Sequence, residues 1–133
     1  MLGSAQWHWL EQVVATSDAS YLVIASSSTP HTFGDESWEQ YPTAFKRITD
    51  LLRRRKCSLV LSGDVHRNAV YDDSGVIEIV SSGVARNGIV FGSPRKNYGI
   101  LTFDKEQVRV ELRSLKVGGR FDFSIARNHW VLP

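Results

Sequence analysis

The residues best suited to chemistry lie in one short motif, Leu-Val-Leu-Ser-Gly-Asp-Val-His, at residues 59–66. The apolar run that opens it is typical of a buried strand, and Gly63 allows a sharp turn where that strand ends. Asp64 and His66 then follow the carboxyl end of the strand, where open α/β sheets place their functional groups. A carboxylate and an imidazole two residues apart can bind one metal ion or two adjacent ions. A turn aspartate and a rim histidine are also common without any ligand, so the motif alone leaves both interpretations open.

Other polar side chains are candidates for the same site. His31 lies on the loop after an earlier apolar segment, at the same sheet edge if the two strands are parallel; a solvated loop histidine is the alternative. Arg67 and Asn68 follow the motif and can donate hydrogen bonds to phosphate oxygens, although Arg67 can equally face solvent. We expect Ser81 and Ser82, beyond another strand, to close a turn or to hydrogen-bond the motif loop.

Composition excludes several other functions. No Gly-x-Ser-x-Gly elbow is present, and the single cysteine, Cys57, rules out an internal disulfide and lies in no catalytic motif. The 16 basic and 14 acidic residues give a net charge of +2, so no nucleic-acid binding is inferred. No segment approaches the about 18 apolar residues of a membrane span, and no signal peptide is visible. We therefore expect a soluble protein whose compartment the sequence does not indicate.

Hydrophobic periodicity predicts the elements that must position the motif. A helix is expected over 4–16, with an apolar stripe of Trp9, Leu10, Val13 and Val14. A second helix begins at Pro42, which suits the first helical turn, and presents Phe45, Ile48, Leu51 and Leu52. Strands are predicted over 21–25 and 58–61, each following a helix.

After the motif the pattern turns to antiparallel β-structure. Strands over 69–71 and 76–80 form one predicted hairpin, and strands over 98–103 and 108–115 form another. In the latter strand, Val108 and its apolar partners alternate with charged residues, so one face should meet solvent. Phe121, Phe123 and Ile125 predict a last strand. The whole pattern is that of a single α/β domain over residues 1–133.

Four segments, in order, resemble the C-terminal part of the PhoD-like metallophosphatases, the alkaline phosphatase D family of calcineurin-like metallophosphoesterases. They are Leu-Gly-Ser-Ala-Gln-Trp-His-Trp-Leu-Glu at 2–11, Glu36-Ser37-Trp38 with Tyr41-Pro42, the motif at 61–66, and 78–83 followed by 97–104. One departure lies after Pro42, where the family has a Glu-Arg pair and this chain has Thr43-Ala44-Phe45. A larger departure is that the family's upstream metal-binding motifs, an early Asp, a Gly-Asp and an Asn segment, have no counterpart in the chain.

The resemblance implies the C-terminal half of an α/β/β/α sandwich, with a mixed sheet and antiparallel hairpins. It implies hydrolysis of phosphate monoesters or diesters by a hydroxide activated by two metal ions. The ions would be divalent or trivalent, with Fe, Ca, Mn, Zn and Mg as candidates. His66 and Asp64 would be catalytic and metal-binding, with His31 as a further candidate ligand, and Arg67 and Asn68 would bind substrate. This chain alone should then be inactive.

Half a sandwich should leave a sheet edge and an apolar face open. We therefore expect the chain to associate with itself or with the missing N-terminal half, and to take a phosphoester as substrate. The alternative from a different class is a non-catalytic, β-rich protein-interaction domain that uses its open edge to bind a partner. Metal binding by the isolated chain separates the two.

Overall fold

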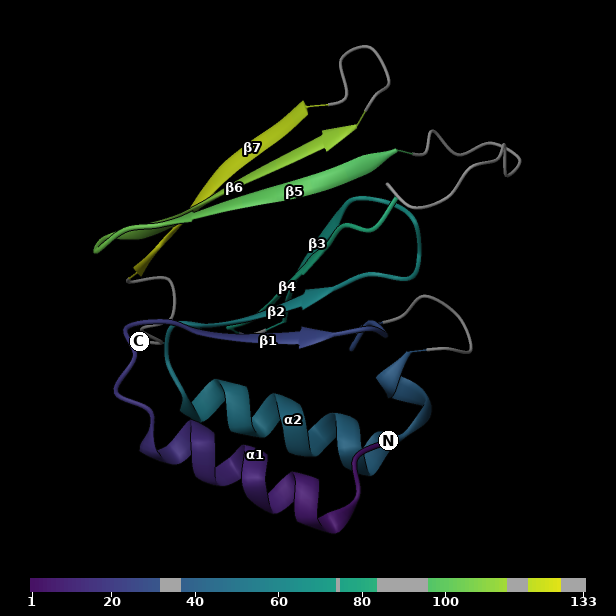
Figure 1. The fold of residues 1–133 in the computed structure, drawn as a ribbon, viewed down its shortest axis with the longest axis vertical. Coiled ribbons are helices and arrows are strands. Elements are labelled where there is room, and N and C mark those ends of the chain that lie inside the picture. The colour runs from purple at the N-terminus through teal and green to yellow at the C-terminus, as the bar shows by residue number, and fades with distance from the viewer. Residues whose placement is uncertain (32–36, 74, 84–95, 115–119, 128–133) are drawn as a thin grey trace.

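Two stacked β-sheets and a layer of two helices make up the fold (Figure 1). The computed structural model describes residues 1–31, 37–73, 75–83, 96–114 and 120–127. Within them the chain is mixed α/β with antiparallel hairpins, as predicted. The elements are α1 (Ser4–Thr16), β1 (Leu22–Ser26), η1 (Trp38–Gln40), α2 (Pro42–Arg54), β2 (Ser58–Ser62), β3 (Ala69–Asp73), β4 (Val76–Val80), β5 (Asn97–Phe103), β6 (Gln107–Ser114) and β7 (Arg120–Ala126). Glu36, in the second resembling segment, lies outside the described residues.

The first sheet, here called the mixed sheet, has the strand order β1-β2-β4-β3. β1, β2 and β4 are parallel, and β3 returns antiparallel to β4 in the predicted hairpin. The register pairs Ser26, the last residue of β1, with Ser62, the last residue of β2. The loops that follow β1 and β2 therefore leave the sheet at the same edge, as the sequence predicts.

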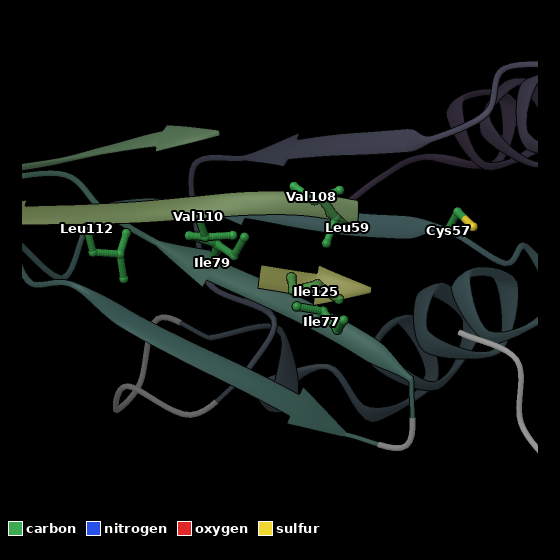
Figure 2. Close-up of a cluster of buried hydrophobic side chains, with 8 residues drawn as sticks. All are labelled: Cys57, Leu59, Ile77, Ile79, Val108, Val110, Leu112 and Ile125. Carbon is green, nitrogen blue, oxygen red and sulfur yellow. The ribbon is translucent and has the colours of Figure 1, made fainter. Parts of the chain in front are cut away.

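The second sheet, here called the antiparallel sheet, has the order β5-β6-β7 and covers one face of the mixed sheet. Figure 2 shows apolar side chains from β2, β4, β6 and β7 meeting between the sheets. This core comprises Cys57, Leu59, Ile77, Ile79, Val108, Val110, Leu112 and Ile125. A second core under the helices comprises Trp7, Ile48, Leu52, Val60 and Val76.

These two cores correct one expectation. We expected half a sandwich to leave an apolar face of the sheet open, but every residue of β4 is buried. The reason is that β5, β6 and β7 fold back over the mixed sheet, so that β2 and β4 lie between two layers of this chain. The edge of β1 differs, because within the described residues β1 pairs with β2 alone, and Val23 is 39% exposed.

The bounds of α1 agree with the prediction, but its buried face does not. Trp7 and Val14 are buried, whereas Trp9 is 63% exposed and Val13 also faces solvent. Trp7 is buried because its ring meets the edge of Trp38, with 6.4 Å between centroids, and because the Arg47 guanidinium lies 4.7 Å above it. In the part of the chain that the structure describes, no helix is both long and apolar enough to cross a membrane.

Candidate functional site

The motif loop, residues 63–66, has an unusual backbone. Asp64 and His66 have positive φ angles of 67° and 53°, in the left-handed region that disfavours residues other than glycine. Between them, the Val65 N–H donates to the Gly63 carbonyl at 2.8 Å. The Asp64 side chain is exposed and that of His66 half-buried. Backbone strain of this kind persists only where surrounding contacts enforce it, and it concentrates at functional sites.

Asn97, at the start of β5, makes several of the hydrogen bonds that hold this strained backbone in place. Its amide nitrogen donates to the His66 carbonyl at 3.1 Å, and its amide oxygen accepts from the N–H groups of Ser82 at 3.0 Å and Gly83 at 3.1 Å. The His66 N–H in turn donates to the Ser82 hydroxyl at 3.2 Å. The predicted hydrogen bond between Ser82 and the motif loop is therefore confirmed. Asn97 opens the resembling segment at 97–104 but was not singled out as a site residue, because its hydrogen-bond partners lie in other parts of the chain.

The Ser82 side chain also explains why residue 63 is glycine. A Cβ atom added there would lie 3.0 Å from the Ser82 Cβ, tighter than nine in ten real Cβ contacts. The end of β2 and the segment after β4 approach each other at this point, and a larger residue would push them apart. Gly63 thus permits the close approach that allows Ser82 to reach the loop.

Asn68 and Arg67, predicted to bind substrate, have different surroundings. The Asn68 amide nitrogen donates to the Arg113 carbonyl at 3.0 Å, and its oxygen accepts from the Ser81 hydroxyl at 2.8 Å. Asn68 therefore joins the two sheets. This structural role uses both the nitrogen and the oxygen of its side-chain amide. Arg67 is exposed beside the motif loop. Substrate binding by either residue stays a prediction.

His31 is buried, unlike a solvated loop histidine. Its Nδ1 lies 2.8 Å from Oε2 of Glu78, which is fully buried on β4, and its backbone N–H donates to the same oxygen at 3.1 Å. The imidazole stacks on Tyr71, with 5.5 Å between ring centroids, and meets Phe45 edge-on at 5.7 Å. Burial raises the pKa of the Tyr71 phenol; Arg67 opposes this shift, and the Glu78 carboxylate adds to it. Ser62 completes the cluster by donating its hydroxyl to Oε1 of Glu78.

The sequence analysis did not single out Glu78, although a signal was present. The strand Val-Ile-Glu-Ile-Val places one carboxylate among four apolar residues, a pattern that indicates a buried charge with partners. Among the described residues, no three His, Cys, Asp or Glu side chains gather into a group that could hold a metal ion. The structure therefore does not bring His31 together with Asp64 and His66 in such a group, and their roles as ligands stay predictions.

The chain matches no family model, and it matches no curated protein. Among solved structures it is similar to Vps29 from Entamoeba histolytica complexed with Zn²⁺, at 12% identity and a TM-score of 0.48, over 74% of this chain and 52% of that one. It is also similar to a conserved, predicted phosphoesterase from Streptococcus pneumoniae, at 13% identity and a TM-score of 0.41, over 71% of this chain and 60% of that one. The chain thus spans about half the length of the first of these structures.

The fold and the motif loop together define the class to which the chain can be assigned. It is a mixed α/β protein whose strained, polar loop follows a parallel strand at its carboxyl end. This is the position at which open α/β sheets bind their ligands.

Proposed function

We propose that this chain forms part of a metal-dependent phosphoesterase centre that hydrolyses phosphate monoesters or diesters. The observation that carries the proposal is the motif loop. It presents Asp64 and His66, two ligand-type side chains, in left-handed conformations that Asn97 and Ser82 hold in place. The resemblance of four segments, in order, to the PhoD-like phosphatases supports hydrolysis of phosphate monoesters or diesters in particular.

The donor chemistry fits a metal ion only in part. Asp64 offers a hard carboxylate oxygen and His66 an imidazole nitrogen, a pair compatible with Fe, Mn or Zn, while the carboxylate also suits Ca and Mg. Because the described residues bring no third His, Cys, Asp or Glu side chain to this loop, further ligands of these types must come from elsewhere. When bound, two such ions would polarise the phosphoryl group and activate water near neutral pH. Arg67, exposed beside the loop, would bind phosphate oxygens.

The edge of β1 that has no partner among the described residues is where the rest of the centre can be added. A strand paired parallel to β1 would bring its own carboxyl-end loop to the edge where the loops after β1 and β2 begin. A segment of a longer protein could supply that strand. A second copy could also occupy the edge by self-association, although two β1 strands related by a two-fold axis would run antiparallel and hold their motif loops apart.

A protein-interaction domain is the second candidate function, and the same edge favours it. β1 has the sequence Leu-Val-Ile-Ala-Ser, without the charge or proline that commonly protects an edge strand from pairing. In that case the edge would bind an extended partner segment, and the motif loop would bind no metal.

Metal titration of the full chain separates the two functions. We expect calorimetry with Zn²⁺ and Mn²⁺ to show weak binding that His66→Ala and Asp64→Ala abolish. His8→Ala is the matched control, because His8 is an exposed histidine on α1. Binding that neither loop variant changes, or no binding at all, would overturn the assignment of the ligands.

Hydrolysis of p-nitrophenyl phosphate provides the second test. The chain alone should show negligible turnover with either metal. In a longer protein that carries the remaining ligands, His66→Ala should reduce turnover by about a hundredfold or more, the scale of losing one contribution to transition-state charge. Strong metal-dependent hydrolysis by these 133 residues alone would show that the centre is complete without a further segment.

A further inference from the structure

Glu78 is a carboxylate in an otherwise apolar interior. It occupies the middle of β4, and its residue is 0% exposed. Its neighbours Ile77 and Ile79 point into the core between the sheets, so Glu78 points to the opposite, helix-covered face. A buried carboxylate is costly unless hydrogen bonds compensate it, and an apolar replacement of similar volume is often as stable. The position of this charge therefore calls for a role other than packing.

The partners of Glu78 come from two other segments of the chain. The His31 backbone N–H donates to Oε2 at 3.1 Å, and the Ser62 hydroxyl donates to Oε1. Nδ1 of His31 lies 2.8 Å from Oε2. Because a carboxylate only accepts, this geometry is that of an Nδ1–H donor. One carboxylate thus joins β4 to the last residue of β2 and to the loop that follows β1.

Ser62 lies at the foot of the motif loop, since the next residue is Gly63. Its side chain is held by Glu78 on the helix-facing side, and its carbonyl accepts from the Ser81 N–H at 3.1 Å. The far end of the loop is held separately, through His66, by Ser82 and Asn97. The loop is therefore fixed at both ends.

We propose that Glu78 is a positioning residue for the motif loop. Through Ser62 it sets the point at which the chain leaves β2, and this fixes the left-handed backbone that aims Asp64 and His66. Through His31 it holds the loop after β1 beside the motif. The importance of this positioning for catalysis rests on the proposed function, but the positioning itself is a property of the chain and is measurable without metal.

The test compares Ser62→Ala with two controls in the full chain. Ser62→Ala removes the hydroxyl that Glu78 accepts, while Ser62→Thr restores it. Thr49→Val removes another buried hydroxyl, which bonds to carbonyls within α2 and lies in a different part of the core. The measurement is the hydrogen-exchange rate of the His66 amide by NMR, together with the melting temperature of each variant.

We expect His66 exchange to become about fivefold faster or more in Ser62→Ala, as for the loss of one buried hydrogen bond, and to stay unchanged in both controls. Glu78→Gln should act in the same direction, because its amide cannot accept from all three donors. A Ser62→Ala rate equal to that of wild type, or an equal acceleration in Thr49→Val, would overturn the proposal.

A Zn²⁺ titration of the same variants keeps this inference separate from the proposed function. If wild type binds Zn²⁺, Ser62→Ala should bind it about tenfold more weakly or worse at a temperature where both proteins are folded, as found for residues that orient ligands. An unchanged Zn²⁺ affinity would show that Glu78 affects only the backbone of the motif loop, and it would overturn the proposed effect of Glu78 on metal binding. If wild type binds no Zn²⁺, the proposed function fails, while the exchange rates still decide whether Glu78 positions the loop.

Discussion

The two sheets share one apolar core but differ in their other faces. The far face of the mixed sheet packs against α1 and α2, and the charge that it holds, Glu78, is buried with His31. The far face of the antiparallel sheet meets solvent, where Arg113 contacts Glu111 and Asp122. Both faces carry ion-pair geometry, in very different surroundings.

This contrast shows how burial changes what a charged contact can do. The contacts around Arg113 are half-buried at the solvent-facing side of β6, where water still reaches the charges, and screening and side-chain entropy reduce the net effect of an ion pair. The contacts of Glu78 are out of water, so removal of one partner leaves an uncompensated polar group. The position of the motif loop and the stability of the protein should therefore be far more sensitive to substitution at Glu78 than to substitution around Arg113.

The largest expected effect is that of Glu78→Ala. It leaves three buried donors without an acceptor and opens a cavity beside β2, so it should lower the free energy of unfolding by about 3–5 kcal/mol. Urea denaturation followed by circular dichroism measures this. Glu111→Ala, which removes a carboxylate from the solvent-facing side of β6, is the control and should have a much smaller effect. Equal effects of the two variants would remove the contrast between the faces.

Substitutions in the shared core should affect both sheets alike. Leu59→Ala on β2 and Leu112→Ala on β6 truncate fully buried side chains in the same cluster. Each should cost about 2–5 kcal/mol of unfolding free energy, from lost burial and the remaining cavity. Calorimetry should show one transition in both variants. A separate early transition in Leu112→Ala would show instead that the antiparallel sheet unfolds on its own.

Arg113→Gln should have a small effect that depends on salt. It removes the contacts with Glu111 and Asp122 but leaves the buried face of β6 unchanged. The melting temperature should fall by about 3 °C or less at low ionic strength. In 1 M NaCl, where the screening length is only about 3 Å, the difference from wild type should disappear. A large loss that persists in salt would mean that Arg113 matters through packing.

The smallest expected effect is on acid stability. Burial raises the pKa of Asp122, but hydrogen bonds from Arg113 and Arg120 outweigh it, so the pKa lies below its ordinary value of 3.8. Hydrogen bonds from the backbone N–H groups of Glu106 and Gln107 likewise lower the pKa of Asp104. A lowered folded-state pKa stabilises the protein above the ordinary value, and this contribution is lost as the pH falls through the folded-state pKa.

Unfolding curves recorded between pH 6 and acid conditions measure this contribution. Stability should decline below about pH 4, the ordinary range of aspartate, and Arg113→Gln should decline less steeply than wild type because its Asp122 pKa shift is smaller. Identical pH profiles would show that Arg113 has no influence on Asp122 in solution.

Much of the fold was predictable because local patterns agree with the tertiary structure. Pro42 at the start of α2, the antiparallel pairing of β3 with β4 and the alternation in β6 each follow from short-range chemistry. The buried face of α1 was not predictable, because two tryptophans two residues apart offer two candidate faces. Contact with Trp38 and Arg47, far along the chain, decides in favour of Trp7.

In the candidate site, too, the features set by local sequence were predictable and those set by distant contacts were not. The motif placed Asp64 and His66 after a strand, and the structure agrees, because that placement depends only on the end of β2. The contacts that hold the loop come from residues distant in sequence, Asn97 on β5 and Glu78 on β4. No periodic pattern of apolar and polar residues in the sequence identifies such partners. The solitary carboxylate in β4 was the one available signal for Glu78.

The left-handed backbone at Asp64 and His66 has a consequence for selection. Glycine adopts this conformation without the penalty of about 1–2 kcal/mol that other residues incur, so glycine at either position should make the protein more heat-resistant. A mutant library sorted only for heat resistance should therefore accumulate glycine at 64 and 66 and lose both ligand-type side chains. A protein lineage that retains Asp and His at these two positions would be under selection for a property other than thermal stability.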